Sequence, residues 1–377
     1  MASLISELEA SDMRVPDYKN SNLSVVNRLA ADYSRGRAHK TVFMALDALG
    51  FSLFSAVLKA RPQLSKVLSN AVIEKVSTVF PTFTLTVFPS LDSGLTPAEH
   101  GIVGPYTPVK ELGRNVDVLG RIQDFEKGYI FPAPKNIEIF NKENRMLYVT
   151  PKEISASSYS KVAFGGGSIR PYVSVIDMFV QVTKAIKSGK YDFVYSYSDI
   201  MDATQHKYFP YAHETIETLY SVFMLLDRLL MPNLRRHGWS LIITADHGHI
   251  VNDKLRVIKP GSASMRFLSA APWGSGRAVI FSVISGFEKA FENAFNKEFG
   301  GDIMLISSSE AIKAGIFGSK HVTNGFEYRF GDYIALPKRN TFLLYAKPGK
   351  EYNRKNFIGG HHGGMSPDEV EVPLIKL

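Results

Sequence analysis

Three short apolar stretches, each leading into an acidic residue, are the feature that most narrows the folds open to this chain. They are residues 41–46, 192–197 and 239–245. Asp47 directly follows the first stretch, Asp246 directly follows the third, and an acidic segment follows the second. Runs of this kind are typical of strands buried on both faces of a sheet. The recurrence of strand, carboxylate and helix predicts an α/β fold with a doubly wound, mostly parallel central sheet flanked by helices.

The length of the chain indicates more than one structural unit. At 377 residues it exceeds the size at which a single hydrophobic core stops growing. Residues 262–330 alternate strand-like and helical patterns and carry none of the candidate ligands. We therefore expect a small α+β cap domain at 262–330, inserted into a catalytic domain formed by residues 1–261 and 331–377. The alternative, that 262–330 is an ordinary extension of the main sheet, stays open at this point.

The composition excludes several kinds of site. Hydrophobic residues make up 45% of the chain and charged residues 21%, which is typical of globular proteins. Because the chain contains no cysteine, disulfides, thiolate zinc sites and a cysteine nucleophile are excluded. Histidine, carboxylate and hydroxyl groups remain for metal binding or covalent chemistry.

Charge and hydropathy patterns bear on location and partners. No apolar run is long enough to cross a bilayer, so we expect no membrane partner. Glu7, Glu9 and Asp12 stand where a signal peptide would need an apolar core, and a cytoplasmic location is expected. The net charge of +8 is spread without a run of five Lys or Arg residues, which favours a solvated basic surface over a nucleic-acid site. The oligomeric state stays unknown from these patterns.

Four segments carry aspartate or histidine next to strand ends, on one helical face or beside glycines. They are Asp47, the pair Asp202 and His206, the adjacent pair Asp246 and His247, and His362. Residues four apart on a helix, such as Asp202 and His206, can chelate one ion or form an ordinary surface pair. Two adjacent polar residues after a buried strand, Asp246 and His247, must leave the core or share a partner. The glycines around His362 let the backbone approach a ligand closely.

The stretch 80–104 carries a further pattern, in which Thr84 stands ten residues before Gly94 and the string L-T-P-A-E-H-G-I-V-G follows. This stretch resembles the nucleophile segment of the alkaline phosphatase superfamily, and most closely its type I phosphodiesterase/nucleotide pyrophosphatase branch. Other similar strings are A-L-D-A-L-G at 45–50, D-A-T-Q-H-K-Y-F-P at 202–210, T-A-D-H-G at 244–248 and H-G-G-M-S-P-D-E at 362–369. Gln205 and Phe209 replace two glycines of the family pattern.

The resemblance implies two metal ions and a threonine nucleophile, Thr84. It implies that one ion is held by Asp47, Thr84, Asp246 and His247, and the other by Asp202, His206 and His362. Nitrogen and oxygen ligands without sulfur suit Zn²⁺ or Mn²⁺, and zinc is favoured where it is available. Asp199, His249 and His361 lie beside these ligands in the sequence, and the family spacing places them outside the first coordination shell.

The activity implied is hydrolysis of phosphodiester or pyrophosphate bonds in nucleotide-like small-molecule phosphate esters, through a phospho-threonine. Pro105 departs from the pattern, because that branch commonly has an asparagine there and proline has no N–H to donate. The alternatives are a phosphomonoesterase, phosphonate hydrolase or sulfatase of the same superfamily, or a catalytically silent anion-binding protein. We expect diesters to be preferred, because no Lys or Arg lies between Lys75 and Lys110. Arg170 and Arg277 are the candidates that could supply a cation from elsewhere.

Overall fold

The computed structural model describes residues 3–19, 22, 40–117, 145–164, 167–346, 349, 352 and 357–377. A seven-stranded sheet forms its centre, with the strand order β2-β17-β8-β1-β7-β5-β6. The strands are β1 (Thr41–Leu46), β2 (Val72–Ser77), β5 (Met146–Pro151), β6 (Ser168–Tyr172), β7 (Phe193–Ser198), β8 (Ser240–Thr244) and β17 (Glu371–Lys376). Strand β1 pairs in parallel with β7 and β8, and β5 pairs in parallel with β6 and β7. The antiparallel pairs of this sheet are the two that β17 makes, with β8 and with the edge strand β2, so the mostly parallel fold class is confirmed.

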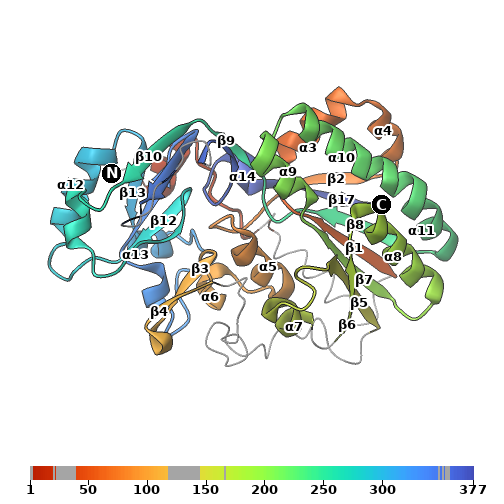
Figure 1. Cartoon of the computed structure of the whole chain (residues 1–377), viewed down its shortest axis with the longest axis horizontal. Helices are drawn as coiled ribbons and strands as arrows, with labels where there is room; N and C mark the ends of the chain where they lie inside the picture. The colour runs from red at the N-terminus through yellow and green to blue at the C-terminus, as the bar shows by residue number, and fades with distance from the viewer. Residues whose placement is uncertain are drawn as a thin grey trace.

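Helices cover both faces of this sheet (Figure 1). One face carries α3 (Phe51–Ala60), α8 (Val175–Ser188) and α10 (His213–Leu225), and the other carries α5 (Thr84–Ser93) and α7 (Ser158–Phe164). Aromatic contacts fix the second layer: the ring of Phe88 on α5 lies 5.0 Å from that of Tyr197, and the rings of Phe164 and Tyr148 stack at 3.6 Å. Strands covered on both sides have no polar face to display, which explains the continuous burial of β1, β5 and β7.

The remaining elements connect these layers. They are α1 (Leu4–Ala10), α4 (Gln63–Val67), α6 (Pro97–His100), β3 (Tyr106–Val109), η1 (Lys110–Leu112), β4 (Arg114–Asp117), α9 (Ile200–Tyr208), the π-helical turn η4 (Leu226–Leu230), α11 (Met231–His237), β9 (Ile250–Asn252), β10 (Lys254–Ile258), η5 (Ala263–Phe267), η6 (Glu327–Phe330), β15 (Thr341–Tyr345), β16 (Gly359–His361) and α14 (Pro367–Val370). Within the described residues, no helix is long and apolar enough to cross a membrane.

A smaller antiparallel sheet forms the second unit, at the left of Figure 1. Its order is β11-β12-β14-β13, with β11 (Trp273–Ser275), β12 (Ala278–Phe281), β13 (Ile303–Ser307) and β14 (Tyr333–Pro337). Two helices accompany it, α12 (Glu288–Phe299) and α13 (Ser308–Lys313). Helix α12 buries Phe291, Phe295 and Phe299 in a separate apolar cluster with strands of this sheet.

The strand pairing extends the smaller unit beyond the predicted boundaries at residues 262 and 330. Strand β14, which we had expected to resume the main domain after residue 331, lies between β12 and β13 of the small sheet. Strand β15 then pairs with β10, outside residues 262–330. Apolar runs such as β14 satisfy the pattern of either sheet, and only the hydrogen-bonding partner decides between them. A division at 262 and 330 is therefore too narrow for the paired unit, and the domain division itself stays a proposal.

Strand β2 is a second difference from the sequence pattern. Residues 51–75 have helical spacing, but the structure ends the helices at Val67 and forms β2 from Val72. Four of the six β2 residues are exposed, so burial alone would not select a strand here. Its backbone groups are satisfied by the antiparallel partner β17, almost 300 residues further along the chain.

A buried ion pair joins the small sheet to α14, and through it to the loop before that helix. Arg277, between β11 and β12, is 1% exposed and donates through two nitrogens to both carboxylate oxygens of Glu369, at 3.0 and 2.9 Å. Glu369 also accepts hydrogen bonds from the N–H groups of Gly364 and Ser366. Burial would raise the pKa of Glu369, but Arg277 and these donors outweigh it and hold the pKa below its ordinary value.

Replacing Arg277 by Met should destabilise the protein, because Glu369 would remain buried without its counter-ion. We expect the free energy of unfolding to fall by about 3–5 kcal/mol, measured by urea denaturation at neutral pH. The double variant Arg277→Met with Glu369→Gln should recover part of this loss, since no charge is then stranded. Equal instability of the single and double variants would contradict a charge-based role.

Candidate metal centre

The candidate ligands meet at the carboxyl ends of three neighbouring strands. Asp47 directly follows β1, Asp246 follows β8 by one residue, and Asp202 lies on α9, which begins just after β7. The register pairs Leu46 with Ser198 and Ala45 with Thr244, so the three strands end at nearly the same level. This is the edge at which open α/β sheets bind ligands, as the sequence pattern predicts.

A first cluster surrounds Nε2 of His247. This atom lies 3.2 Å from Oγ1 of Thr84, 3.5 Å from Oδ1 of Asp47 and 3.3 Å from Oδ2 of Asp246. Ligand atoms about 2.0–2.1 Å from a tetrahedral zinc ion lie roughly 3.3 Å from one another. The three separations match that spacing.

Two buried carboxylate oxygens in this cluster lack a protein partner. Asp246 uses Oδ1 to accept the N–H groups of Ala48 and His247, and Asp47 uses Oδ2 to accept the Tyr197 hydroxyl. The other oxygens, Oδ2 of Asp246 and Oδ1 of Asp47, have no hydrogen-bond partner among the residues that the structure describes. These are the atoms that face His247, so the donor set fits a divalent cation.

The electrostatics of Asp47 point the same way. Burial, together with repulsion from Asp246 and Asp202, raises the pKa of the Asp47 carboxyl well above its usual range. A bound cation would reverse this effect, because it stabilises the ionised form of every carboxylate around it.

A second cluster surrounds Oδ1 of Asp202. The Nε2 atoms of three histidines lie close to it: His249 at 2.8 Å, His206 at 3.3 Å and His362 at 3.8 Å. One ligand atom from each of these four residues lies within 4.8 Å of the others. Ligand atoms of Asp202, Asp47 and His247 also lie within 4.8 Å of one another, so the Asp202 carboxylate lies between the two clusters.

The imidazoles of this cluster influence the Asp202 carboxylate strongly. Burial would raise the pKa of Asp202, but hydrogen bonds from His206 and His249 outweigh it and hold the pKa well below its ordinary value. Burial also lowers the pKa of His362 well below its usual range, so that ring is neutral at physiological pH and can ligate a metal.

The side chains of His361 and His362 point in different directions because of a small antiparallel ribbon. Strand β16 pairs with β9 so that His361 lies opposite Ile250. Because neighbouring side chains of a strand point to opposite faces, His362 turns toward the cluster. His361 contacts the rings of Phe342 and His206, with centroids 4.5 and 5.4 Å apart, but contributes no atom to either ligand group among the described residues. Asp199 is exposed and takes part in neither cluster. The structure thus brings His362 into the centre and leaves His361 and Asp199 outside it.

Thr84 differs from the two threonines beside it. Thr82 is fully buried and its hydroxyl donates to the Gly364 carbonyl, while Thr86 is fully buried within α5. Thr84 is the first residue of α5 and is only partly buried, with its hydroxyl beside His247. Of these three hydroxyls, the one selected by the ten-residue spacing to Gly94 is therefore the one at the metal centre.

The other polar residues of the segment that follows α5 are structural. His100 is buried, and its Nδ1 accepts the N–H of Ile102 at 3.1 Å while its Nε2 lies 2.9 Å from the Ser90 hydroxyl. Burial lowers the pKa of His100 to about 3, so the ring stays neutral. Thr96 and Glu99 form a capping box around α6. These residues fold the turn and do not contact the metal centre.

Neither candidate arginine faces Thr84. Arg277 is committed to Glu369 in the buried ion pair described above. Arg170 donates to the Gln181 carbonyl at 3.3 Å, and its guanidinium lies 5.9 Å from the centroid of the Tyr191 ring. The described residues therefore place neither of these cations beside Thr84.

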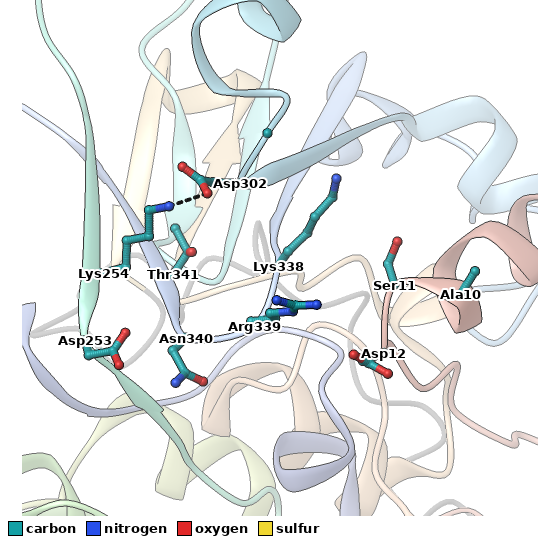
Figure 2. Close-up of a pocket in the computed structure, with 11 residues that line it drawn as sticks. Ala10, Ser11, Asp12, Asp253, Lys254, Asp302, Lys338, Arg339, Asn340 and Thr341 are labelled. Atoms are coloured by element: carbon teal, nitrogen blue, oxygen red, sulfur yellow. Dashed lines mark hydrogen bonds and ion pairs between the residues drawn. The ribbon is translucent and has the colours of Figure 1, made fainter.

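Two cavities outside the ligand clusters differ in character. Figure 2 shows one of about 540 Å³ between the end of α1, the start of β10 and the turn before β15, where Lys254 and Asp302 form an ion pair. It contains none of the cluster residues. The other, of about 380 Å³, is lined by the aromatic residues Tyr106, Trp273, Phe342, Tyr345 and Phe357. None of the residues that line it belongs to a ligand cluster, but Phe342 contacts His361, whose ring also packs against that of His206.

Several solved structures share this fold. Murine ectonucleotide pyrophosphatase/phosphodiesterase 5 is 18% identical with a TM-score of 0.67, covering 89% of this chain and 87% of that one. The human protein of the same name is 16% identical with a TM-score of 0.69, covering 89% and 87%. Phosphonoacetate hydrolase from Sinorhizobium meliloti 1021, in complex with phosphonoacetate, is 20% identical with a TM-score of 0.68, covering 90% of each chain.

No curated protein matches the sequence of this chain. A family model does: the one described as type I phosphodiesterase/nucleotide pyrophosphatase matches residues 41–365. That match spans six of the seven strands of the main sheet, both ligand clusters and the small sheet, and ends before β17. The chain therefore belongs to the type I phosphodiesterase/nucleotide pyrophosphatase family, within the alkaline phosphatase superfamily.

Proposed function

We propose that the chain is a metal-dependent hydrolase that cleaves phosphodiester or pyrophosphate bonds of a small, nucleotide-like phosphate ester. One observation carries the proposal. The Thr84 hydroxyl lies 3.2 Å from Nε2 of His247, beside the unpartnered buried oxygens of Asp47 and Asp246. A nucleophile needs a partly exposed oxygen, which Thr84 has, and a cation held by the oxygens of Asp47 and Asp246 would favour its ionised form.

The donor sets support two divalent ions, with Zn²⁺ the better fit and Mn²⁺ the alternative. Asp47, Thr84, Asp246 and His247 would hold one ion. Asp202, His206 and His362 would hold the other. When bound, two such ions would neutralise phosphate charge and lower the pKa of the Thr84 hydroxyl.

The residues of the chain would then act as follows. Oγ1 of Thr84 gives its proton to solvent water and attacks phosphorus, and a new P–O bond forms. The bond to the leaving oxygen breaks, and its electron pair goes to that oxygen, which takes up a proton from water. Water afterwards hydrolyses the phospho-threonine and regenerates the hydroxyl. The first N–H groups of a helix have no partner within the helix, so the start of α5 offers donors to the phosphoryl oxygens. Pro105 cannot contribute such a donor.

A relative supports the role of the threonine. An inactive threonine-to-alanine variant of murine ectonucleotide pyrophosphatase/phosphodiesterase 5 has been solved in complex with AMP. Its fold matches this chain with a TM-score of 0.66 over 90% of the residues, at 18% identity. We propose that Thr84 has the corresponding role and that a nucleoside phosphate is the kind of ligand the site accepts.

The surroundings of Thr84 favour an esterified phosphate. Phe83, Leu85 and Phe88 are buried next to it, and the two candidate arginines are engaged elsewhere. The aromatic cavity beside His361 offers space for an aromatic or nucleoside group attached to the phosphate. A cytoplasmic location remains a prediction of the N-terminal sequence pattern.

Replacing Thr84 by Ala should abolish turnover of a bis-aryl phosphodiester, by about 10³-fold or more in kcat, because the nucleophilic oxygen is lost. Thr84→Ser should retain part of the activity. Mass spectrometry of enzyme quenched during turnover should find the aryl phosphate group on residue 84. The same group trapped on Thr82 or Thr86 would move the nucleophile and refute this assignment.

The purified protein should bind two transition-metal ions per chain, as measured by elemental analysis. His362→Ala should empty mainly the second site and reduce turnover strongly, because His362 lies in the Asp202 cluster. His361→Ala is the matched control and should matter far less. At most one ion per chain, with activity that chelators do not affect, would contradict the two-metal proposal, whereas absence of both bound metal and activity would favour a silent anion-binding protein.

A diester should be cleaved with at least about 10-fold higher kcat/KM than the matched monoester at saturating metal. Phe342→Ala should raise KM for an aryl diester more than for a methyl diester, because only the aryl group can fill the aromatic cavity. The same assay should include phosphonoacetate and an aryl sulfate. A higher kcat/KM for the monoester, the phosphonate or the sulfate would reassign the activity within the superfamily.

A further inference from the structure

His249 is a buried histidine of the second cluster to which the proposed mechanism gives no role. Its ring is 3% exposed, and its Nε2 lies 2.8 Å from Oδ1 of Asp202. This is the shortest of the three contacts between a histidine and that oxygen. The sequence spacing sets His249 apart from the ligands, yet the structure places it within their reach.

The β9–β16 ribbon explains how His249 gets there. His361 is paired with Ile250, so continuing the antiparallel register by one residue sets His249 opposite His362. Side chains that lie opposite each other share one face of a ribbon, and the two rings stack with centroids 5.0 Å apart. Gly360 leaves room for the His249 ring, because a Cβ at that position would lie 2.8 Å from its Nδ1.

The hydrogen bonds of the Nδ1 atoms distinguish a histidine that ligates a metal from one that only lies nearby. Nδ1 of His362 lies 2.8 Å from the Thr82 carbonyl, and Nδ1 of His247 lies 3.2 Å from the Gly248 carbonyl. A metal-bound histidine almost always donates its second N–H in this way, which leaves Nε2 free for the metal. Nδ1 of His249 is buried and has no hydrogen-bond partner among the described residues.

For His249 to ligate through Nε2, its proton would have to sit on that unpartnered Nδ1. With the proton on Nε2, the ring instead donates to Asp202, and Nδ1 becomes a bare acceptor. A buried structure tolerates a bare acceptor better than an unpaired N–H. The 2.8 Å contact is then an ordinary charge-assisted hydrogen bond.

We propose that His249 is a positioning residue of the second metal site: it donates its Nε2–H to Oδ1 of Asp202 and fixes the direction in which that carboxylate presents its oxygens. The inference rests on the proposed two-metal function. Asp202 lies between the two clusters, so its orientation affects the second ion most directly and the first through Asp47. Groups that orient a metal ligand in this way typically change metal affinity by about 10–100-fold.

The test compares three substitutions at residue 249 by titrating metal-free full-length protein with Zn²⁺ against a chromogenic chelator. His249→Ala and His249→Asn should weaken the second Zn²⁺ by about 10–100-fold. His249→Gln should restore most of that affinity, because the glutamine amide nitrogen is as many bonds from the backbone as Nε2 of histidine. His361→Ala is the matched control and should bind both ions as the wild type does.

Cobalt substitution separates a positioning role from ligation. At saturating Co²⁺, the visible absorption bands of His249→Ala should keep their wild-type positions, because the ligands themselves are unchanged. Shifted bands, together with a glutamine variant as weak as the alanine variant, would overturn the proposal in favour of His249 as a ligand. Unchanged Zn²⁺ affinity in all three variants would overturn it altogether. Failure of the wild type to bind a second ion would instead refute the proposed two-metal function.

Discussion

The concentration of carboxylates at one end of the sheet is the constraint on which the rest of the structure depends. Asp47 and Asp246 are almost fully buried at neighbouring strand ends, and Asp202 lies next to them. Burial and mutual repulsion would keep Asp47 protonated unless a positive charge balances it. The arrangement is costly as a structural device and fits a cation-binding centre.

Holding these groups together requires segments that are distant in the sequence to approach very closely. A Cβ on Gly248 would lie 2.1 Å from the Asp368 carbonyl and 2.6 Å from Cα of Gly50, so only glycine fits beside His247. Gly363, with a φ of +121°, packs against Phe83, which precedes Thr84. The loop that carries Gly363 is tied to the small sheet by Arg277 and Glu369. The metal centre therefore depends on contacts made well outside it.

Local patterns were sufficient to predict the central strands and the site at their carboxyl ends. β1 matches the expected stretch, β7 and β8 match within one or two residues, and the predicted ligands converge there. The sequence could not reveal which strands pair, because β2 and β14 form hydrogen bonds with strands from other parts of the chain. The position of His249 likewise depends on the β9–β16 register, which no local spacing reveals. The sequence predicted individual elements but not which elements would pack against one another.

Charge balance links the carboxylates to the substrate proposed for them. Asp47, Asp202 and Asp246 together carry three negative charges when ionised, and the histidines around them are neutral as metal ligands. Two divalent ions would bring four positive charges, which would leave one in excess while Thr84 is protonated and no substrate is bound. A phosphodiester carries one negative charge and cancels that excess, whereas a monoester dianion would leave the site negative. Because Arg277 is neutralised by Glu369, it supplies no further cation to make up the difference. The buried ion pair that joins the two sheets thus also removes an arginine that a monoesterase would need beside its nucleophile.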